Sequence, residues 1–265
     1  MIIKYRSYLE NFCPNKIKLD TEGWAGSAQE FKSTKKVQPF LCKPFTDANL
    51  YGWELIYPYN TTVKIYKDIN VLKIDAEENW AKDGDLVKKH GVPIGAIGDN
   101  HFGINTALDI QVPENYVLRI ENHPSFYSEH NLPCIIPGHL ETNWWSSLFF
   151  IVCKAPANGE TLTISKDCKL AQIFPVIKNL PDNLVEMTKE EKINRAEMYA
   201  CLNMNRKNLA SGYKDDKNNF FDNLYKKMSK YYSIFGHDGL NKLVNKLMGK
   251  LKGFKKLKLK FFKNR

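Results

Sequence analysis

The middle of the chain, residues 51–180, alternates short apolar runs with turn-forming residues. Most of the runs are separated by Pro, Gly, Asn or Asp. Eight are rich in β-branched and aromatic residues: GWELIYPY, TTVKIYK, NVLKIDA, ALDIQV, YVLRIEN, LFFIVCKA, TLTISK and LAQIFPVI. Runs of this kind are typical of β-strands. Because many short strands at this spacing favour all-β architectures, we expect a mainly β fold, a single β-barrel or β-sandwich. Residues 80–93 read as a loop or a short helix within it.

The regions on either side of this β core have other patterns. Residues 1–50 hold apolar pieces broken by Pro and Lys, which predicts an N-terminal arm around the core. Thr188-Lys-Glu-Glu191 has the form of a capping box, and helical spacing follows, so residues 181–210 are expected to form a helical segment that packs on the core. Residues 211–239 are polar and are expected to be a linker.

Residues 240–265 predict a basic amphipathic helix, since apolar residues recur every three or four positions. This tail holds ten of the 39 basic residues and no acid, which leaves 39 − 10 = 29 basic against 29 acidic residues in the rest. It can dock on its own core, or bind an anionic membrane surface or nucleic acid. Its expected contacts are Lys242, Lys246, Lys250, Lys252, Lys255 and Lys256.

Cysteine usage and hydropathy restrict the location. The six cysteines form no C-x-x-C pair and read as reduced thiols, although an even count leaves a disulfide framework open. No apolar run approaches the ~18 residues of a membrane span, and the N-terminus is a poor secretory signal. We expect a cytoplasmic protein, with peripheral membrane association through the tail as an alternative.

The stretch GHLETNWW, residues 138–145, concentrates candidate chemistry. In an extended chain Glu141, Asn143 and Trp145 share one face, which suits a binding or catalytic site. The alternative is a turn in which the polar side chains satisfy backbone groups while the tryptophans pack. Both interpretations stay open.

Histidines offer a second kind of site. His139 and Glu141 form an H-x-E pair that, with His101, His123 or His130 as third ligand, would make a facial triad for Fe(II). Only His237 lies downstream, which departs from the usual order in such oxygenases. Hydrogen-bonded histidines without a metal are the alternative.

Two further positions are candidates for a pocket. His101-Phe-Gly103 follows a Gly-Asp-Asn loop whose backbone donors could receive an anion, although it lacks the Lys-Ser/Thr of a P-loop. Glu54 follows Trp53 on a strong strand, as a pocket acid or as a salt-bridge partner.

Three motifs resemble a bacterial and phage family known only as a domain of unknown function, family 6065. They are Pro44-Phe-Thr-Asp-Ala-Asn-Leu-Tyr-Gly-Trp-Glu54, His101-Phe-Gly103, and Pro137-Gly-His-Leu-Glu-Thr-Asn-Trp144 with Leu170-Ala-Gln-Ile-Phe-Pro175. The third motif has Asn143 where that family usually carries Asp. The resemblance implies no reaction.

A more distant resemblance is to the deoxyuridine triphosphatase and dCTP deaminase β-barrels. It is carried by the order of Val112-Pro-Glu-Asn-Tyr-Val-Leu118, His123-Pro-Ser125, Gly138-His-Leu-Glu-Thr-Asn-Trp144 and Cys168-Lys-Leu-Ala-Gln-Ile-Phe174. The resemblance implies that Glu141 replaces the Asp that activates water, that Trp144 replaces a Tyr under the deoxyribose, and that Ser125 contacts phosphate. It also implies Mg²⁺ held mainly by substrate phosphates and an assembly of three barrels.

The chain departs from that pattern in three ways. Glu is one methylene longer than Asp, and a displacement on the order of an ångström can cost about a hundredfold in rate. His-Pro-Ser replaces Arg-Ser-Ser, and the basic tail replaces the Gly-rich lid.

We therefore expect a deoxyuridine-triphosphatase-like or jelly-roll-like β fold with C-terminal helices that binds a small polar ligand, such as a nucleotide, near Glu141. The ligand-binding candidates are His101, Ser125, Asn143, Trp144 and Glu54, and Glu141 is the candidate general base. Catalysis, cofactor and oligomeric state stay open. The alternatives are an interaction protein tethered by its tail and an Fe(II)-dependent oxygenase on a double-stranded β-helix with His139, Glu141 and His101 as ligands.

Overall fold

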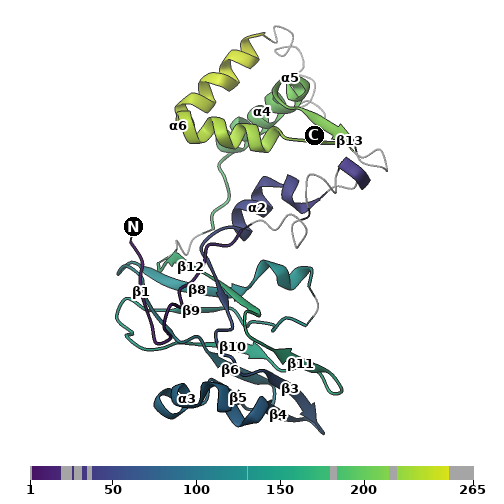
Figure 1. The fold of residues 1–265 in the computed structure, drawn as a ribbon. Helices are drawn as coiled ribbons and strands as arrows, with labels where there is room; N and C mark the ends of the chain where they lie inside the picture. Colours follow the sequence, from purple (N-terminus) through teal and green to yellow (C-terminus); the bar gives the residue numbers. More distant parts are fainter. Residues whose placement is uncertain are drawn as a thin grey trace. The chain divides into compact units, whose positions relative to one another are not determined.

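The computed structural model describes residues 2–18, 26, 32–34, 38–129, 131–179, 184–214 and 220–250. The chain divides into two units (Figure 1). Unit 1 comprises Met1–Ser27 and Gln38–Leu180, and unit 2 comprises Ala28–Val37 and Pro181–Arg265. Each unit is described by itself.

Unit 1 is built mainly from short strands. They are β1 (Lys4–Ser7), β2 (Trp53–Ile56), β3 (Val63–Asp68), β4 (Val71–Ala76), β5 (Ile94–Ile97), β6 (His101–Asn105), β7 (Leu108–Gln111), β8 (Tyr116–Asn122), β9 (Gly138–Leu140), β10 (Phe150–Lys154), β11 (Thr161–Ile164) and β12 (Lys169–Ile177). Each of the eight predicted runs contains one of these strands. β1, β5, β6 and β9 were not predicted, because they are short and carry little apolar alternation.

The strands pair antiparallel in separate sheets. The orders are β2-β12-β8-β9, β10-β6-β5, β11-β3-β4 and the two-stranded β1-β7. In Figure 1, β12, β8 and β9 lie above β10 and β6, with β3, β4 and β5 below them. The prediction of a mainly β fold with C-terminal helices is confirmed. The described strands do not close into a barrel, because β4, β5 and β9 each have one partner and leave open sheet edges.

One hydrophobic core joins these sheets. Side chains that point inward from different sheets, such as Leu55, Ile65, Phe102 and Ile173, are almost completely buried. The exposed Lys64 between buried Val63 and Ile65 shows the alternation of a strand with one face in the core. Shared burial therefore holds unit 1 together, as in a β-sandwich.

Two of the motif residues have clear structural tasks. Gly52 has a φ of +85°, and a Cβ there would lie 2.1 Å from the carbonyl oxygen of Ile173. Only glycine tolerates both the dihedral and the close approach. Gln172, buried on β12, donates to the carbonyl oxygens of Ala48 at 3.0 Å and Tyr51 at 2.6 Å. These residues fix the chain that enters β2.

Helical elements connect the strands of unit 1. They are the 3₁₀ helices η1 (Pro39–Leu41), η2 (Glu77–Asp83) and η3 (Pro124–Tyr127), and the α-helices α2 (Lys43–Asn49) and α3 (Gly84–His90). α3 lies within residues 80–93, where a loop or a short helix was expected. The N-terminal region contributes β1, η1 and α2.

Unit 2 consists of helices and a hairpin: α4 (Lys189–Met204), α5 (Arg206–Leu209), β13 (Gly212–Lys214), β14 (Phe220–Asp222) and α6 (Leu224–Lys250). The capping box is confirmed, since Thr188 and Glu191 bond each other's backbone N–H. The region expected to be a linker holds the hairpin and the first part of α6. The lysine-rich helix starts at Leu224 and breaks at Gly236, which has a φ of +62°. Lys252, Lys255 and Lys256 lie outside the described residues.

All six cysteines are free thiols, and Cys13 and Cys42 are exposed. Burial raises the pKa of the Cys168 thiol to about 11, so this group stays protonated at neutral pH. Within the described ranges, no helix combines the length and the apolar character needed to cross a bilayer.

Candidate functional sites

The predicted site residues lie in several separate places on unit 1. Glu141 and Trp144 form one contact, Glu54 and Ser125 belong to a buried polar cluster, Asn143 borders a groove, and His101 lines a cleft. None of the four hollows described below is lined by more than one of Glu141, His101 and Glu54.

Glu141 follows β9 at the start of a turn. One carboxylate oxygen, Oε2, accepts from Lys178 Nζ at 2.7 Å and from the Trp144 indole Nε1 at 2.8 Å. The Lys178 ammonium and then the Trp144 indole lower the pKa of Glu141. A low pKa favours the carboxylate but weakens it as a general base. The catalytic role of Glu141 stays a prediction.

Trp144 and Trp145 are both exposed, at 63% and 50%, and their rings meet edge to face with centroids 5.7 Å apart. The Trp145 N–H donates to the Glu141 carbonyl oxygen at 3.1 Å and closes the turn. The turn interpretation expected packed tryptophans. The turn is present, but the two tryptophans are exposed and pack against each other only edge to face.

The buried polar cluster begins with His123. This residue is 2% exposed and precedes η3, where its Nδ1 accepts the Ser125 backbone N–H at 3.1 Å. Because Nδ1 is an acceptor, Nε2 carries the proton and donates to Glu54 Oε2 at 3.3 Å. Glu54 and Ser125 are thus joined through one histidine with its tautomer set.

Lys169 completes the cluster from β12. Its Nζ lies 3.0 Å from the hydroxyl of the fully buried Ser125 and 2.7 Å from Glu129 Oε1. Burial raises the pKa of Glu129, but hydrogen bonds from Lys169 and Ser125 outweigh burial and the net pKa is lowered. The hydrogen-bonding groups of this cluster face one another. Ligand binding by Glu54 and Ser125 remains a prediction, and a ligand would have to displace these contacts.

Asn143 borders two adjoining hollows, of about 470 and 260 Å³, which form one open groove. Both hollows share Lys4, Gln111 and Asn143. β1 and β7 supply the floor, because Lys4 pairs with Gln111 and Arg6 with Asp109 across the two strands. Thr142, Asn143 and Ser146 come from the turn after β9. We call this hollow the Asn143 groove.

His101 lines a larger cleft of about 850 Å³, which we call the His101 cleft. Lys154, its cross-strand partner on β10, and Lys67 at the end of β3 line it as well. Lys67 Nζ donates to Asn100 Oδ1 at 2.8 Å, and neither lysine forms an ion pair with a described carboxylate. Apolar lining comes from Phe126, Leu132, Pro156 and Leu162.

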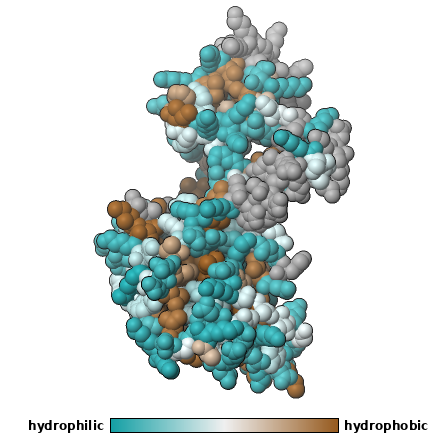
Figure 2. All heavy atoms as spheres, in the orientation of Figure 1, coloured by the Kyte–Doolittle hydropathy of each residue, from teal (hydrophilic) through white to brown (hydrophobic). Residues whose placement is uncertain are grey.

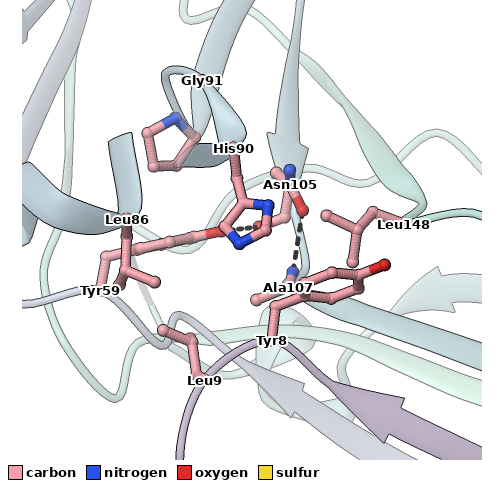
Figure 3. A pocket seen from close by; sticks show the side chains of 10 residues that line it. Tyr8, Leu9, Tyr59, Leu86, His90, Gly91, Asn105, Ala107 and Leu148 are labelled. Atoms are coloured by element: carbon pink, nitrogen blue, oxygen red, sulfur yellow. Dashed lines mark hydrogen bonds between the residues drawn. The ribbon is translucent and has the colours of Figure 1, made fainter. Parts of the chain in front are cut away.

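A fourth hollow, of about 10 Å³, lies between α3 and the Asn105–Ala107 turn. Figure 3 shows Tyr8, His90 and Leu148 around it, together with two hydrogen bonds. Tyr59 donates to the Asn105 carbonyl oxygen at 3.1 Å, and Asn105 Oδ1 accepts from the Ala107 N–H at 2.9 Å. The second bond supports Ala107 at a φ of +57°. The volume suits about one water molecule rather than a ligand.

The metal alternative gains no support from the described residues. No three His, Cys, Asp or Glu side chains in this part of the chain lie where they could hold one ion. His139 Nε2 lies 3.2 Å from Arg119 Nη1, and His101 belongs to the separate cleft. His130, the other histidine considered, lies outside the described residues.

Sequence reasoning missed the residues that accompany the candidates. Lys154 and Lys67 join His101, Lys169 joins Ser125, and Lys4 joins Asn143. Lys169 stands within the motif Cys168-Lys-Leu-Ala-Gln-Ile-Phe174, but nothing in that motif marks it as a partner of Ser125. No motif marks the other three lysines, since each comes from a strand distant in sequence. The only local signal was Thr142, which stands beside Asn143 within the GHLETNWW stretch.

Comparison with known proteins gives a weak likeness to dUTPases. No protein-family model and no curated protein matches the chain, so the resemblance to family 6065 is unsupported. Among solved structures, native EIAV dUTPase is 13% identical with a TM-score of 0.34, and a dUTPase from phage phi11 of S. aureus is 14% identical with a TM-score of 0.37. Each of these two similarities covers 71% of this chain and 99% of the dUTPase chain. A Staphylococcus bacteriophage 80alpha dUTPase with dUpNHpp is 12% identical, covers 71% and 90%, and has a TM-score of 0.36.

Proposed function

We propose that this protein binds a nucleotide or a closely related phosphate-bearing ligand in the His101 cleft. The observation that carries the proposal is the combination, in one cleft, of an aromatic ring and two lysines that pair with none of the described carboxylates. Its volume, about 850 Å³, lies within the ~300–1,000 Å³ range of small-molecule sites.

The lining suits both ends of a nucleotide. Lys67 and Lys154 supply cations for phosphate oxygens, and charge-assisted hydrogen bonds of this kind are stronger than neutral ones. Phe126 offers a ring face or edge to a base. Asn100 and Asn131 offer amide groups for sugar or base atoms. Glu160 is the one carboxylate in the lining, and its Oε2 already accepts from the Ala157 N–H at 3.2 Å.

The proposal concerns binding, and turnover is a separate question. Glu141, the candidate general base, does not line this cleft. Release of pyrophosphate or phosphate from a nucleotide panel, measured for the protein and for Glu141→Gln, tests catalysis independently of binding.

Binding is tested by calorimetry and thermal shift with nucleoside triphosphates, the matching nucleosides and inorganic triphosphate. Triphosphates should bind tightest, and Lys154→Glu or Lys67→Glu should weaken binding on the order of tenfold, the effect of about 1.4 kcal/mol. Lys73→Glu on β4 is the matched control, since Lys73 is exposed and does not line the cleft. Failure of every nucleotide to bind, or unchanged binding by Lys154→Glu, would contradict the proposal.

A second candidate function is a tether through unit 2, which α6 favours. Residues 224–250 hold six lysines and one acid, Asp238, and on this helix Tyr225, Ile234 and Phe235 are at least half exposed. Figure 2 shows apolar surface over α6 bordered by hydrophilic surface. Aromatic residues beside lysines suit an anionic membrane surface, where rings sit among headgroups.

Vesicle flotation tests the tether. The full chain should float with vesicles that contain phosphatidylserine at low salt and less at high salt, whereas a chain truncated after residue 223, which lacks α6 and the residues after it, should float less. Equal flotation of both chains would rule out a tether formed by residues 224–265. Retention on DNA rather than on vesicles would favour nucleic acid as the partner.

A further inference from the structure

We propose that the Asn143 groove is a second binding site, for a polyol that carries one acid group, such as a sugar acid. The site is distinct from the His101 cleft: the two share no lining residue. The inference therefore does not depend on nucleotide binding.

Unsatisfied hydrogen-bonding groups mark this groove. Thr142 is 4% exposed, and its hydroxyl Oγ1 has no hydrogen-bond partner among the described residues. The amide oxygen Oδ1 of Asn143 is buried and unpartnered in the same way. A buried acceptor without a donor costs about 1–3 kcal/mol, and most buried polar atoms in folded proteins are paired. These two exceptions lie on residues that line one groove. Both oxygens are closed to solvent in this structure, so a ligand with O–H or N–H donors bonds them when the turn after β9 shifts to expose them.

The groove also contains an available cation. Lys4 forms no ion pair with a described carboxylate, whereas Arg6 Nε is paired with Asp109 Oδ2 at 2.7 Å. The half of the groove lined by Thr142 and Ser146 therefore carries one uncompensated positive charge. In the other half, Glu114 and Lys4 line the same hollow, so their formal charges add to zero. An acid group on the ligand is best placed in the first half.

The remaining lining selects a hydroxyl-rich ligand. Gln111, Ser146 and Tyr5 add amide and hydroxyl groups to the half with Thr142, and aliphatic side chains are absent from its lining. Small-molecule sites are usually lined mainly by apolar side chains. A volume of about 260 Å³ admits a monosaccharide-sized molecule, and the adjoining hollow leaves room for extension.

The experiment uses the full chain with D-glucuronate, D-glucose and acetate as probes, observed by saturation-transfer NMR. Glucuronate should show the strongest transfer, glucose less and acetate least. Thr142→Val should reduce the glucuronate signal severalfold. The same variant should have an unfolding midpoint no lower than the parent protein, because it replaces an unpartnered buried hydroxyl by a methyl group of similar shape.

Two further variants separate the acceptor from the charge. Asn143→Asp keeps an acceptor at this position but adds a negative charge, so it should lose glucuronate and retain glucose. Lys4→Gln should weaken glucuronate alone. Lys73→Glu, far from the groove lining, is the control and should leave all signals unchanged.

Each outcome of these experiments either supports or contradicts a binding site in the Asn143 groove. No saturation transfer from glucuronate, or equal transfer in the parent and Thr142→Val, would overturn the proposal. A lowered midpoint in Thr142→Val would show that the hydroxyl has a structural task and would also contradict it. Selective loss of glucuronate in Asn143→Asp would support both the site and the class of ligand.

Discussion

The buried cluster around His123 and the Asn143 groove both contain polar and charged side chains. Their hydrogen-bonding groups are paired in the cluster and partly unpaired in the groove. In the cluster, His123 and Lys169 bond Glu54, Ser125 and Glu129. In the groove, Thr142 Oγ1 and Asn143 Oδ1 have no partner among the described residues. The cluster resembles catalytic chemistry but its bonding capacity is used within the fold. Unused capacity is the better guide to a binding site.

The largest expected effect comes from breaking the cluster at its centre. His123→Ala would leave a cavity, free the Ser125 backbone N–H and remove the bond to Glu54, so we expect a loss of about 3 kcal/mol in unfolding free energy. Urea denaturation measures it. His139→Ala is the control, because His139 is exposed and should cost less than about 0.5 kcal/mol. Equal effects of the two substitutions would mean that the cluster is not a structural centre.

Two buried threonines sharpen the comparison further. Thr106 Oγ1 donates to the Phe149 carbonyl oxygen at 2.9 Å, whereas Thr142 Oγ1 has no partner in the part of the chain that the structure describes. Thr106→Val should therefore lower the unfolding free energy by about 1–3 kcal/mol, and Thr142→Val should leave it equal or higher. Parallel urea titrations of both variants measure the difference. A similar loss in both would show that the Thr142 hydroxyl is satisfied after all.

The cluster should also respond to pH. The pKa of Glu129 is lowered in the folded state from an ordinary value of 4.5, so its stabilisation is present above that pH and is lost as the pH falls through the folded-state pKa. Because Glu129 and Lys169 are 40% and 32% exposed, this part amounts to about 1 kcal/mol or less. The stability difference between the parent and Lys169→Met should shrink between pH 6 and pH 3. A difference that is constant with pH would exclude the ion pair as its source.

The smallest effect is expected at Glu141. The side chains of Glu141 and Lys178 are 41% and 38% exposed. Ion pairs between such exposed side chains contribute little to stability. Glu141→Gln should leave the urea midpoint of unfolding unchanged within the error of the titration. A lowered midpoint would indicate that the Glu141 carboxylate organises the turn before Asn143.

The sequence predicted more of the fold than of the candidate sites. The apolar alternation of segments such as TTVKIYK predicted eight strands, and Thr188-Lys-Glu-Glu191 predicted a helix start, because these signals are local. The strands β5 and β6 escaped prediction because neither alternates: β5 is exposed at three of its four positions, and β6 is buried at four of its five. The candidate residues His101, Glu54 and Asn143 were identified by type, but their partners could not be.

Local patterns alone determined that the chain is mainly β, that α4 begins at a capping box and that a lysine-rich helix follows near the end. Tertiary structure decided which polar groups are used and which remain available. Lys169 comes from β12 to Ser125, Lys154 from β10 to His101, and Lys4 from β1 to Asn143. Lys154 and His101 are partners in the register of β10 on β6, and the other two lysines reach their neighbours because segments far apart in the chain pack together. Hydrogen-bond satisfaction is therefore a property of the folded structure, and no local pattern contains it.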